Sequence, residues 1–166
     1  LVQPVQHYKY LGLVIQSNLK WDINTKKQYS KGRSSLHLLK QLKALNINSK
    51  ILHKFYNSVV LPSFTYCLPA FYHSLTTSQR RLLLRIEKAS RRTMNTNTES
   101  LNILLTSRVR SKVYKTLIDN SHPIHTSFQF LPSGKRPRSI KANLCRYQNS
   151  FVPSSIKTFN SINLSS

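Results

Sequence analysis

The chain has 166 residues, of which 39% are hydrophobic, and this is enough for one domain with a modest core. Its 26 Lys and Arg residues stand against four acidic residues, giving a formal net charge of +22 at pH 7 that internal ion pairing cannot neutralise. Such an excess is typical of proteins that bind an external polyanion, which is most often nucleic acid, with an anionic membrane surface as the rival.

The longest apolar stretches are broken by Pro62, Pro69 and polar residues, which excludes a run of ~20 apolar residues that could span a membrane. Cys67 and Cys145 are too few and too isolated for a disulfide framework, so we expect an intracellular protein, in a nuclear or cytoplasmic ribonucleoprotein. The start at Leu1 lacks an initiator Met and a secretory signal, and we therefore expect the chain to begin inside a longer reading frame.

Residues 5–16 are rich in β-branched and aromatic types and are interrupted by Gly12, which predicts a short strand pair or a bulged strand. From Asp22, a good N-cap, the period becomes helical up to residues 46–48. Gly32 costs about 1 kcal/mol relative to Ala inside a helix and indicates a kink or an earlier loop. The predicted apolar stripe consists of Leu36, Leu38, Leu39, Leu42 and Leu45.

A second helix is predicted from Ser49, its cap, to near Pro62, because proline disfavours helical geometry in the residue before it. The segment 64–72 is the most apolar of the chain and should lie in the core, where we also place most aromatic side chains. The expected buried face of this helix is formed by Ile51, Leu52, Phe55 and Val59. The aromatic residues assigned to the core are Phe55, Tyr66 and Phe71.

A third helix is predicted from Ser78, with Leu82, Ile86 and Ala89 on its apolar face. A fourth should run from about Thr98 to residues 119–121, since leucine and valine recur every four residues. The positions of that repeat are Leu101, Leu105, Val109, Val113 and Leu117.

The residues from 122 onward lose this periodicity and predict a basic, loop-rich tail with a short closing helix at 154–160. The expected fold is therefore mainly α: a short N-terminal β element, a bundle of about four helices and an extended basic C-terminal tail. The corresponding segments are 1–21, 22–121 and 122–166.

The four acidic residues cannot form an aspartate pair for two-metal phosphoryl transfer, because none lies within three residues of another. We therefore expect no catalytic residue, no cofactor, no metal ion and no enzymatic activity of the chain on its own. His122, His125 and Cys145 are the best candidates for a metal site, but a structural zinc site needs four ligands at closer spacing. The acids are Asp22, Glu87, Glu99 and Asp119.

Basic residues on helix faces carry the remaining chemistry. The run 80–92 holds six basic residues and one acid, whereas a solvated helix face usually mixes both signs, so phosphate contacts are expected there. Exposed aromatics could stack on unpaired bases, and Tyr8, Tyr10 and Trp21 are the candidates. The predicted nucleic-acid contacts are Lys26, Arg33, Lys40, Arg80, Arg81, Arg85, Lys88, Arg91, Arg92, Lys135, Arg136 and Arg138.

Six blocks of the chain resemble, in order, the region after the palm of reverse transcriptases from non-LTR (LINE-type) retrotransposons. The first block, residues 8–15 followed by 18–22, resembles the (F/Y)KYLG-x-x-I…NL-x-W stretch of that family. Residues 36–42, 50–56 and 75–76 are similar to its thumb helices, and residues 131–136 and 149–153 to its closing segments.

This resemblance implies a primer-grip-like turn at Tyr10, Leu11 and Gly12, and thumb helices that hold template RNA and growing DNA. It implies a fragment of an RNA-directed DNA polymerase whose palm and fingers, with the catalytic aspartates, lie upstream of Leu1. The expected partners are RNA, DNA or their hybrid and the upstream palm and fingers of the same polyprotein, with no membrane partner.

Two other readings remain open. An inert, pseudogene-like remnant would expose apolar surface at Val5, Leu11, Val14 and Leu19, where a palm domain is missing, and would aggregate. A basic helical interaction module is the other, since residues 33–45 also resemble a short amino-terminal segment of tRNA-modifying AlkB-homologue proteins. No HxD…H iron site and no glycine-rich cofactor loop supports an oxygenase or methyltransferase activity.

Overall fold

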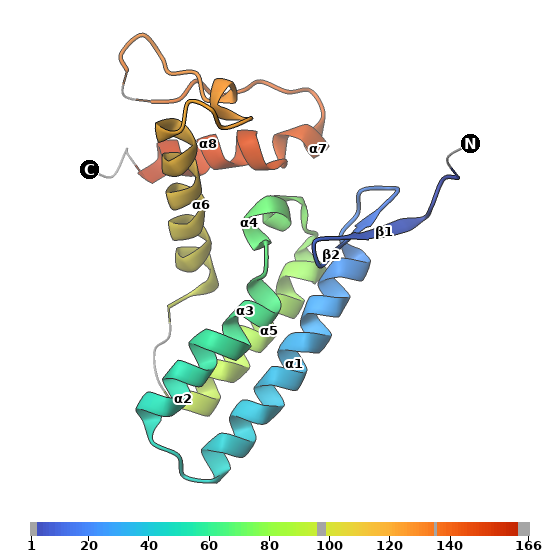
Figure 1. Ribbon diagram of the computed structural model, residues 1–166, viewed down its shortest axis with the longest axis vertical. Coiled ribbons are helices and arrows are strands. Elements are labelled where there is room, and N and C mark those ends of the chain that lie inside the picture. The colour runs from blue at the N-terminus through green and yellow to red at the C-terminus, as the bar shows by residue number, and fades with distance from the viewer. Residues whose placement is uncertain (1–2, 96–98, 135, 163–166) are drawn as a thin grey trace. The chain divides into compact units, whose positions relative to one another are not determined.

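The structure, a computed structural model, describes residues 3–95, 99–134 and 136–162. It is mainly helical with one short two-stranded sheet near the N-terminus, as predicted (Figure 1). The chain forms two compact units, the first from Leu1–Leu68 and Leu75–Leu101, the second from Pro69–Ser74 and Asn102–Ser166. These units differ from the three predicted segments, because the helix that begins at Leu101 falls almost entirely in the second unit.

In the first unit, β1 (His7–Tyr10) and β2 (Leu13–Gln16) form an antiparallel hairpin with Tyr10 opposite Leu13. Leu11 and Gly12 have φ angles of 45° and 84°, and positive φ at both central positions is the geometry of a type I′ turn. The predicted strand pair is thus confirmed. Val14 is buried, and its amide donates to Asn24 Oδ1 at 3.2 Å, which joins the hairpin to the following helix.

The helix α1 (Asp22–Ala44) continues through Gly32 without a break, so the predicted kink or loop is wrong. Gly32 is buried where α1 approaches two other helices, which explains the absence of a side chain. The predicted stripe is only partly right: Leu36 and Leu39 are buried, whereas Leu38 and Leu45 are exposed. The N-cap is Trp21 without a side-chain cap, and Asp22 lies in the first turn, where a carboxylate favours the helix dipole.

The next helical segment does not end at Pro62, contrary to the prediction. It runs from α2 (Ser49–Phe55) through a π-helical turn (Tyr56–Val60) into α3 (Leu61–Thr65), where Pro62 lies in the first turn. Pro62 has no N–H to donate to the preceding turn of this continuous run, and the wider π turn before it gives its ring room. Asn48 rather than Ser49 caps α2, since its side chain accepts from the Lys50 amide at 2.8 Å.

The pattern of buried side chains in this segment differs from the prediction, and from Tyr56 onward the π turn accounts for the difference. Ile51 and Val59 are 55% and 40% exposed, so their predicted place in the core is wrong. The buried side chains recur instead every four residues, because a π turn adds a residue to the helical repeat. They are Leu52, Tyr56, Val60 and Phe64.

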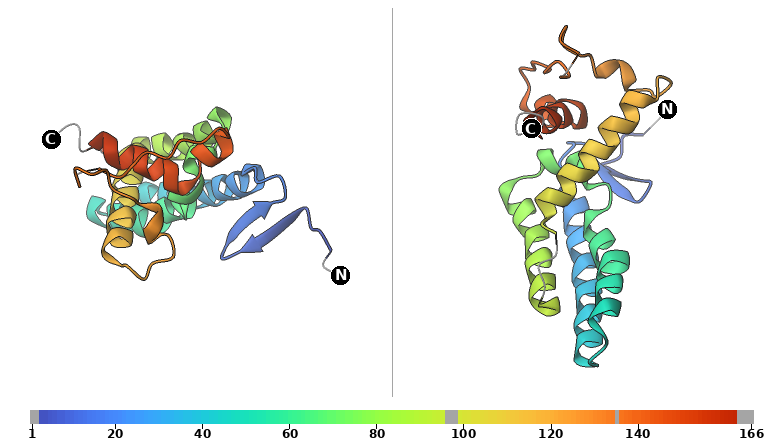
Figure 2. Two further views of the ribbon diagram at one scale, coloured as in Figure 1. Left: turned by 90° about the horizontal axis from the view of Figure 1, so that it is seen from above. Right: turned by 90° about the vertical axis from the view of Figure 1, so that its left-hand side faces the viewer.

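A short helix α4 (Leu68–Phe71) and a 3-10 turn (Tyr72–Ser74) precede α5 (Thr77–Met94). Thr76, not Ser78, caps α5 through a capping box with Gln79: the Gln79 amide donates to Thr76 Oγ1 at 3.3 Å, and the Thr76 amide donates to Gln79 Oε1 at 2.8 Å. Phe71 is buried as predicted, but Tyr66 is 47% exposed and does not belong to the core. The α1, α2–α3 and α5 segments run side by side as a small bundle (Figure 2).

In the second unit, α6 (Leu101–Ile118) buries the first four positions of the predicted repeat and half-buries Leu117, which confirms that prediction. The expected start at Thr98 lies outside the described residues. Further along are a 3-10 turn (His125–Ser127), a β-bridge between Phe130 and Pro137, and the helices α7 (Cys145–Gln148) and α8 (Phe151–Ile162). The predicted closing helix is therefore present and longer than expected.

Candidate nucleic-acid interface

The interface candidate is built on the packing of α1 against α5. At their starts, Gln79 Nε2 of α5 donates to Asp22 Oδ1 of α1 at 2.5 Å. Further along, Gly32 of α1 faces Ile86 of α5, so closely that a Cβ on Gly32 would lie 2.5 Å from Ile86 Cδ1. The first turns of α1 and α5 are therefore in contact with each other, and so are their middle turns. This means that the two helices run parallel.

One flank of α1 faces α3. Gln28 Nε2 donates to the Tyr66 carbonyl at the end of α3 at 2.8 Å, and Lys27 and Lys31 share a pocket with Pro62. The opposite flank carries Lys26, Arg33 and Lys40, all exposed. A seven-residue spacing returns to nearly the same direction, within about 20°, at about 100° per residue. The three cations therefore form one row beside α5.

The helix α5 shows the same division. Leu83, Glu87 and Met94 are buried on the flank that turns into the bundle. Arg85 and Arg92 lie on the other flank, about 100° and 120° from Ile86, and Arg81 and Lys88 lie farther toward the outer side of α5, at about 140° and 160°. For two parallel right-handed helices, the flanks that turn away from α2–α3 point to the same side. We name this surface the cationic face. Its members are Lys26, Arg33, Lys40, Arg81, Arg85, Lys88 and Arg92, all exposed.

Tyr29 is an addition that the sequence interpretation missed. Its half-buried ring lies on the same flank of α1, with the Arg33 guanidinium 5.9 Å from the ring centroid. A cation over an aromatic ring at this distance is attracted to it, which limits the positions that the Arg33 side chain takes. The i,i+4 spacing of Tyr29 and Arg33 on one helix was the available signal.

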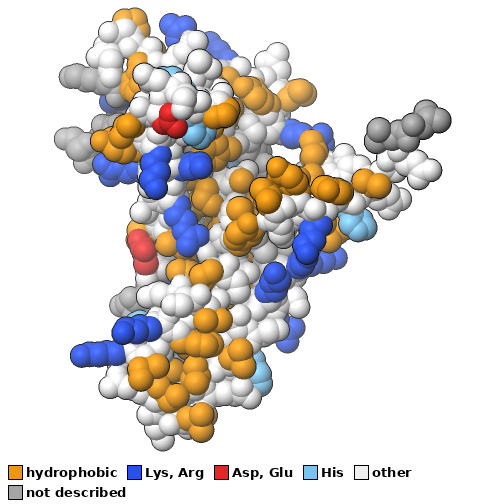
Figure 3. All heavy atoms as spheres, in the orientation of Figure 1, with side chains coloured by type: hydrophobic (Ala, Val, Ile, Leu, Met, Phe, Trp, Pro, Cys, Tyr) orange, Lys and Arg blue, Asp and Glu red, His pale blue; other side chains and the backbone are white. Residues whose placement is uncertain are grey.

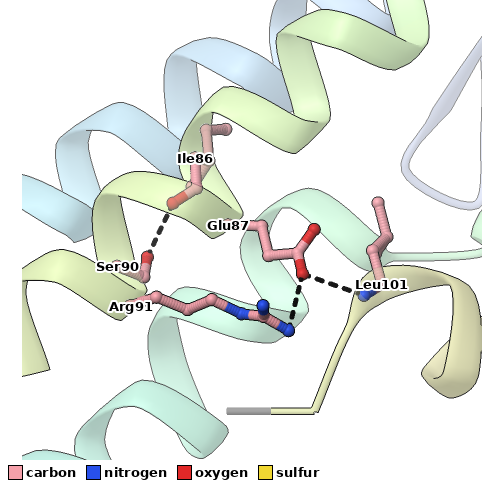
Figure 4. Close-up of polar contacts among 5 residues, drawn as sticks. All are labelled: Ile86, Glu87, Ser90, Arg91 and Leu101. Carbon is pink, nitrogen blue, oxygen red and sulfur yellow. Dashed lines mark hydrogen bonds and ion pairs between the residues drawn. The ribbon is translucent and has the colours of Figure 1, made fainter. Parts of the chain in front are cut away.

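The Lys and Arg side chains of the cationic face have almost no acidic side chains nearby to neutralise their charge. Among the described residues there is a single ion pair, between Arg91 and Glu87. Lys and Arg side chains outnumber the acidic ones on the surface drawn in Figure 3. The acids instead serve local hydrogen bonds: Glu87 Oε1 accepts from the Leu101 amide at 3.1 Å and from Arg91 at 3.1 Å (Figure 4).

Four predicted contacts lie elsewhere. Arg91 is engaged by Glu87 on the inner flank of α5, and Arg80 is half-buried. Arg136 and Arg138 belong to the second unit, where the Arg138 amide donates to the Gln129 carbonyl at 2.6 Å beside the β-bridge. Lys135 lies outside the described residues. The structure thus brings together seven of the twelve predicted cations.

The predicted primer-grip-like residues form the tip of the hairpin. Tyr10 and Leu11 are 57% and 74% exposed, and Gly12 has a positive φ. The Tyr66 hydroxyl donates to the Leu11 carbonyl at 2.7 Å, which ties the turn to the end of α3. A side-chain hydrogen bond with Cys67 raises the pKa of the Tyr66 phenol above its ordinary value.

The other aromatic and apolar candidates divide by exposure. Tyr8 is 63% exposed, whereas Trp21 is half-buried. Val5 and Leu19 are exposed along with Leu11, as the remnant interpretation expects. Val14 is buried, so its predicted exposure is wrong.

No metal site emerges from the histidines. His125 Nδ1 lies 2.9 Å from the Thr116 carbonyl, and His122 Nδ1 accepts from the Ile124 amide at 3.3 Å. Within the described part of the chain, no three His, Cys, Asp or Glu side chains gather in a way that could hold a metal ion. Cys145 is exposed at the start of α7.

Of the helices that the structure describes, none combines the length and the apolar character needed to cross a membrane. No protein-family model matches the chain, and neither a curated protein nor a solved structure does.

Proposed function

We propose that this chain is a non-catalytic nucleic-acid-binding module that holds phosphate backbones on its cationic face. The observation that carries the proposal is that Arg85 and Arg92 of α5 point to the same side as Arg33 of α1, all exposed and without a carboxylate partner among the described residues. Two parallel rows of cations on a pair of packed helices match a nucleic-acid duplex, which is a rod with regularly spaced phosphates.

The resemblance to LINE-type reverse transcriptases gives this module a place in a larger protein. We propose that it is the thumb-like part of an RNA-directed DNA polymerase, with its helices against template RNA and growing DNA. An in-frame aspartate-pair motif in the reading frame upstream of Leu1 would support this assignment. An intact upstream frame without one would contradict it and leave only the general nucleic-acid proposal.

The test of binding is the affinity of the purified chain for a labelled RNA–DNA hybrid over a salt series. Each phosphate contact steepens the slope of log affinity against log salt concentration by roughly 0.7 to 0.9. The variant R81A/R85A/K88A/R92A removes four exposed cations from the cationic face. We expect its slope to be shallower by about 3 and its affinity at low salt to fall at least tenfold.

A matched control removes the same charge from elsewhere in the first unit. Lys20, Lys43, Lys50 and Lys54 are all exposed and lie outside the cationic face. Their fourfold alanine variant has the same net charge as the first variant, so it measures the general loss of attraction. If the two variants lose equal affinity and slope, the cationic face is not the binding surface.

A further inference from the structure

A second feature of the first unit is a pocket of about 340 Å³ on the flank of α1 opposite the cationic face. Three elements form it: the hairpin turn at Gly12, the first half of α1, and the end of α3 with Pro62 and Ser63. Small-molecule sites begin at about 300 Å³, so the volume suits a ligand no larger than one nucleotide.

Two residues that line the pocket, Asn24 and Gln28, carry side-chain amides in which one atom has no hydrogen-bond partner among the described residues. Asn24 is 1% exposed, and its Oδ1 accepts from the Val14 amide at 3.2 Å. Gln28 is 5% exposed, and its Nε2 donates to the Tyr66 carbonyl at 2.8 Å. Among the described residues, neither Asn24 Nδ2 nor Gln28 Oε1 has a hydrogen-bond partner.

Asn24 Nδ2 is a donor and Gln28 Oε1 is an acceptor, and both atoms are buried in side chains of residues that line the same pocket. A buried polar atom without a partner costs about 1 to 3 kcal/mol, and a ligand that pairs with it recovers that cost. The edge of a nucleic-acid base presents a donor and an acceptor side by side, which is the pattern complementary to an amide N–H and an amide C=O.

The rim supplies charge and the wall supplies an aromatic ring. Lys27 and Lys31 are one helical turn apart on α1, and neither has an ion pair within the described part of the chain. Tyr66 contributes its ring, which the hydrogen bond to the Leu11 carbonyl holds beside Gly12. Aromatic rings stack on bases of any sequence, and ammonium groups bind phosphate.

We infer that this pocket binds one unpaired nucleotide, with the phosphate at Lys27 and Lys31, the base against Tyr66, and the base edge at Asn24 and Gln28. The nucleotide is either free or part of a bound strand. In the second case the inference rests on the proposed function: the cationic face holds the duplex, and the pocket takes a nucleotide from its single-stranded end.

The first arm of the test uses nucleoside monophosphates, added to the isotope-labelled chain and followed by NMR. We expect the side-chain amide signals of Asn24 and Gln28 to shift on saturation. The variant K27Q/K31Q should weaken this binding at least tenfold. The control K43Q/K50Q removes the same charge from exposed lysines outside both the pocket and the cationic face, and should change the binding less than twofold. Equal loss in both variants, or no shift of the amide signals, overturns a site for free nucleotides.

The second arm compares a blunt RNA–DNA hybrid with one that carries a single unpaired nucleotide at its end. We expect the overhang to increase the affinity at least threefold for the parent chain and for K43Q/K50Q, and to give no increase for K27Q/K31Q. The variant N24D keeps Oδ1 for Val14 but replaces the donor by a charged oxygen, and it should also lose the increase.

The two arms together decide the inference. If neither monophosphates nor the overhang bind through Lys27 and Lys31, the pocket is not a nucleotide site, whatever the salt dependence shows. A steep salt dependence that still requires Arg81, Arg85, Lys88 and Arg92 would then leave the proposed function standing. If monophosphates bind normally but the hybrid does not bind at all, the pocket stands and the proposed function fails.

Discussion

Gly32 of α1 packs against Ile86 of α5 so closely that there is no room for a Cβ between them. A Cβ on Gly32 would lie 2.5 Å from Ile86 Cδ1 and 3.1 Å from Phe64 Cβ. The contact lies between the two rows of the cationic face, and a side chain at position 32 would force Ile86 Cδ1 to turn aside and Phe64 Cβ to move by a few tenths of an ångström. A glycine that weakens the isolated helix therefore serves the packing of the bundle.

We predict that G32A destabilises the first unit. The gain in helix propensity of about 1 kcal/mol is smaller than the 1 to 3 kcal/mol that overpacking typically costs, so the net loss should be about 1 kcal/mol. Urea denaturation measures it. I86V removes the Cδ1 atom that the new methyl group would meet, so the double variant should be more stable than the sum of the two single changes. Simple additivity would show that the contact is not the cause.

Glu87 should stabilise the chain mainly through the Leu101 amide rather than through Arg91. The carboxylate is 5% exposed, while the Arg91 side chain is 34% exposed and its attraction is screened by solvent. E87A leaves the Leu101 amide without its acceptor and should cost about 1 to 3 kcal/mol. E87Q keeps an acceptor oxygen and should cost less.

Hydrogen exchange at the Leu101 amide separates these two roles of Glu87. We expect protection to be lost in E87A and largely kept in E87Q and R91A. If R91A removes the protection as fully as E87A does, the ion pair is the more important of the two interactions.

The hairpin turn should become more stable on substitution of Leu11 by asparagine. Leu11 has a φ of 45°, a conformation that leucine adopts at a cost and that asparagine adopts readily. L11N should therefore stabilise the turn by about 0.5 to 1 kcal/mol, seen as slower amide exchange in β1 and β2. V5N also removes one exposed apolar side chain, in front of β1, and serves as control. Equal effects of both would point to lost apolar surface instead of turn geometry.

Asp119 gives the chain a pH dependence with a definite sign. The Ser121 hydroxyl and amide donate to Asp119 Oδ1 at 2.6 Å and 2.9 Å, which lowers the pKa of this carboxyl, with a smaller contribution from His122 and His125. Because the pKa is lowered on folding, the stabilising contribution is complete above the unfolded pKa and is lost as pH falls through the folded pKa.

The variant S121A removes the stronger donor, and we expect the Asp119 pKa to rise toward its ordinary value. A carboxyl carbon NMR titration measures it directly. S127A, which removes a hydroxyl outside this hydrogen-bonded turn, should leave the Asp119 pKa unchanged. An Asp119 titration that is identical in S121A and the parent chain would contradict the assigned cause.

Periodicity predicted the helices well where one helix runs without interruption. The repeat of α6 identified four buried positions from Leu101 to Val113, because each step of four residues returns to the same face. The same reasoning failed for Val59 in the α2–α3 segment, which is exposed. A π turn has no reliable sequence signal, and a single added residue per turn moves every later side chain to another face.

The amino-acid sequence by itself determined the charge, the helical content and each row of cations, since neighbours on one helix are set by spacing alone. The tertiary structure decided that the row containing Lys26 on α1 and the row containing Arg85 on α5 lie on the same side of the helix pair. This arrangement depends on the parallel packing at Gly32 and on the flank that α3 covers. The pocket likewise required the fold, because its residues come from a hairpin turn, α1 and α3, which only long-range packing brings together.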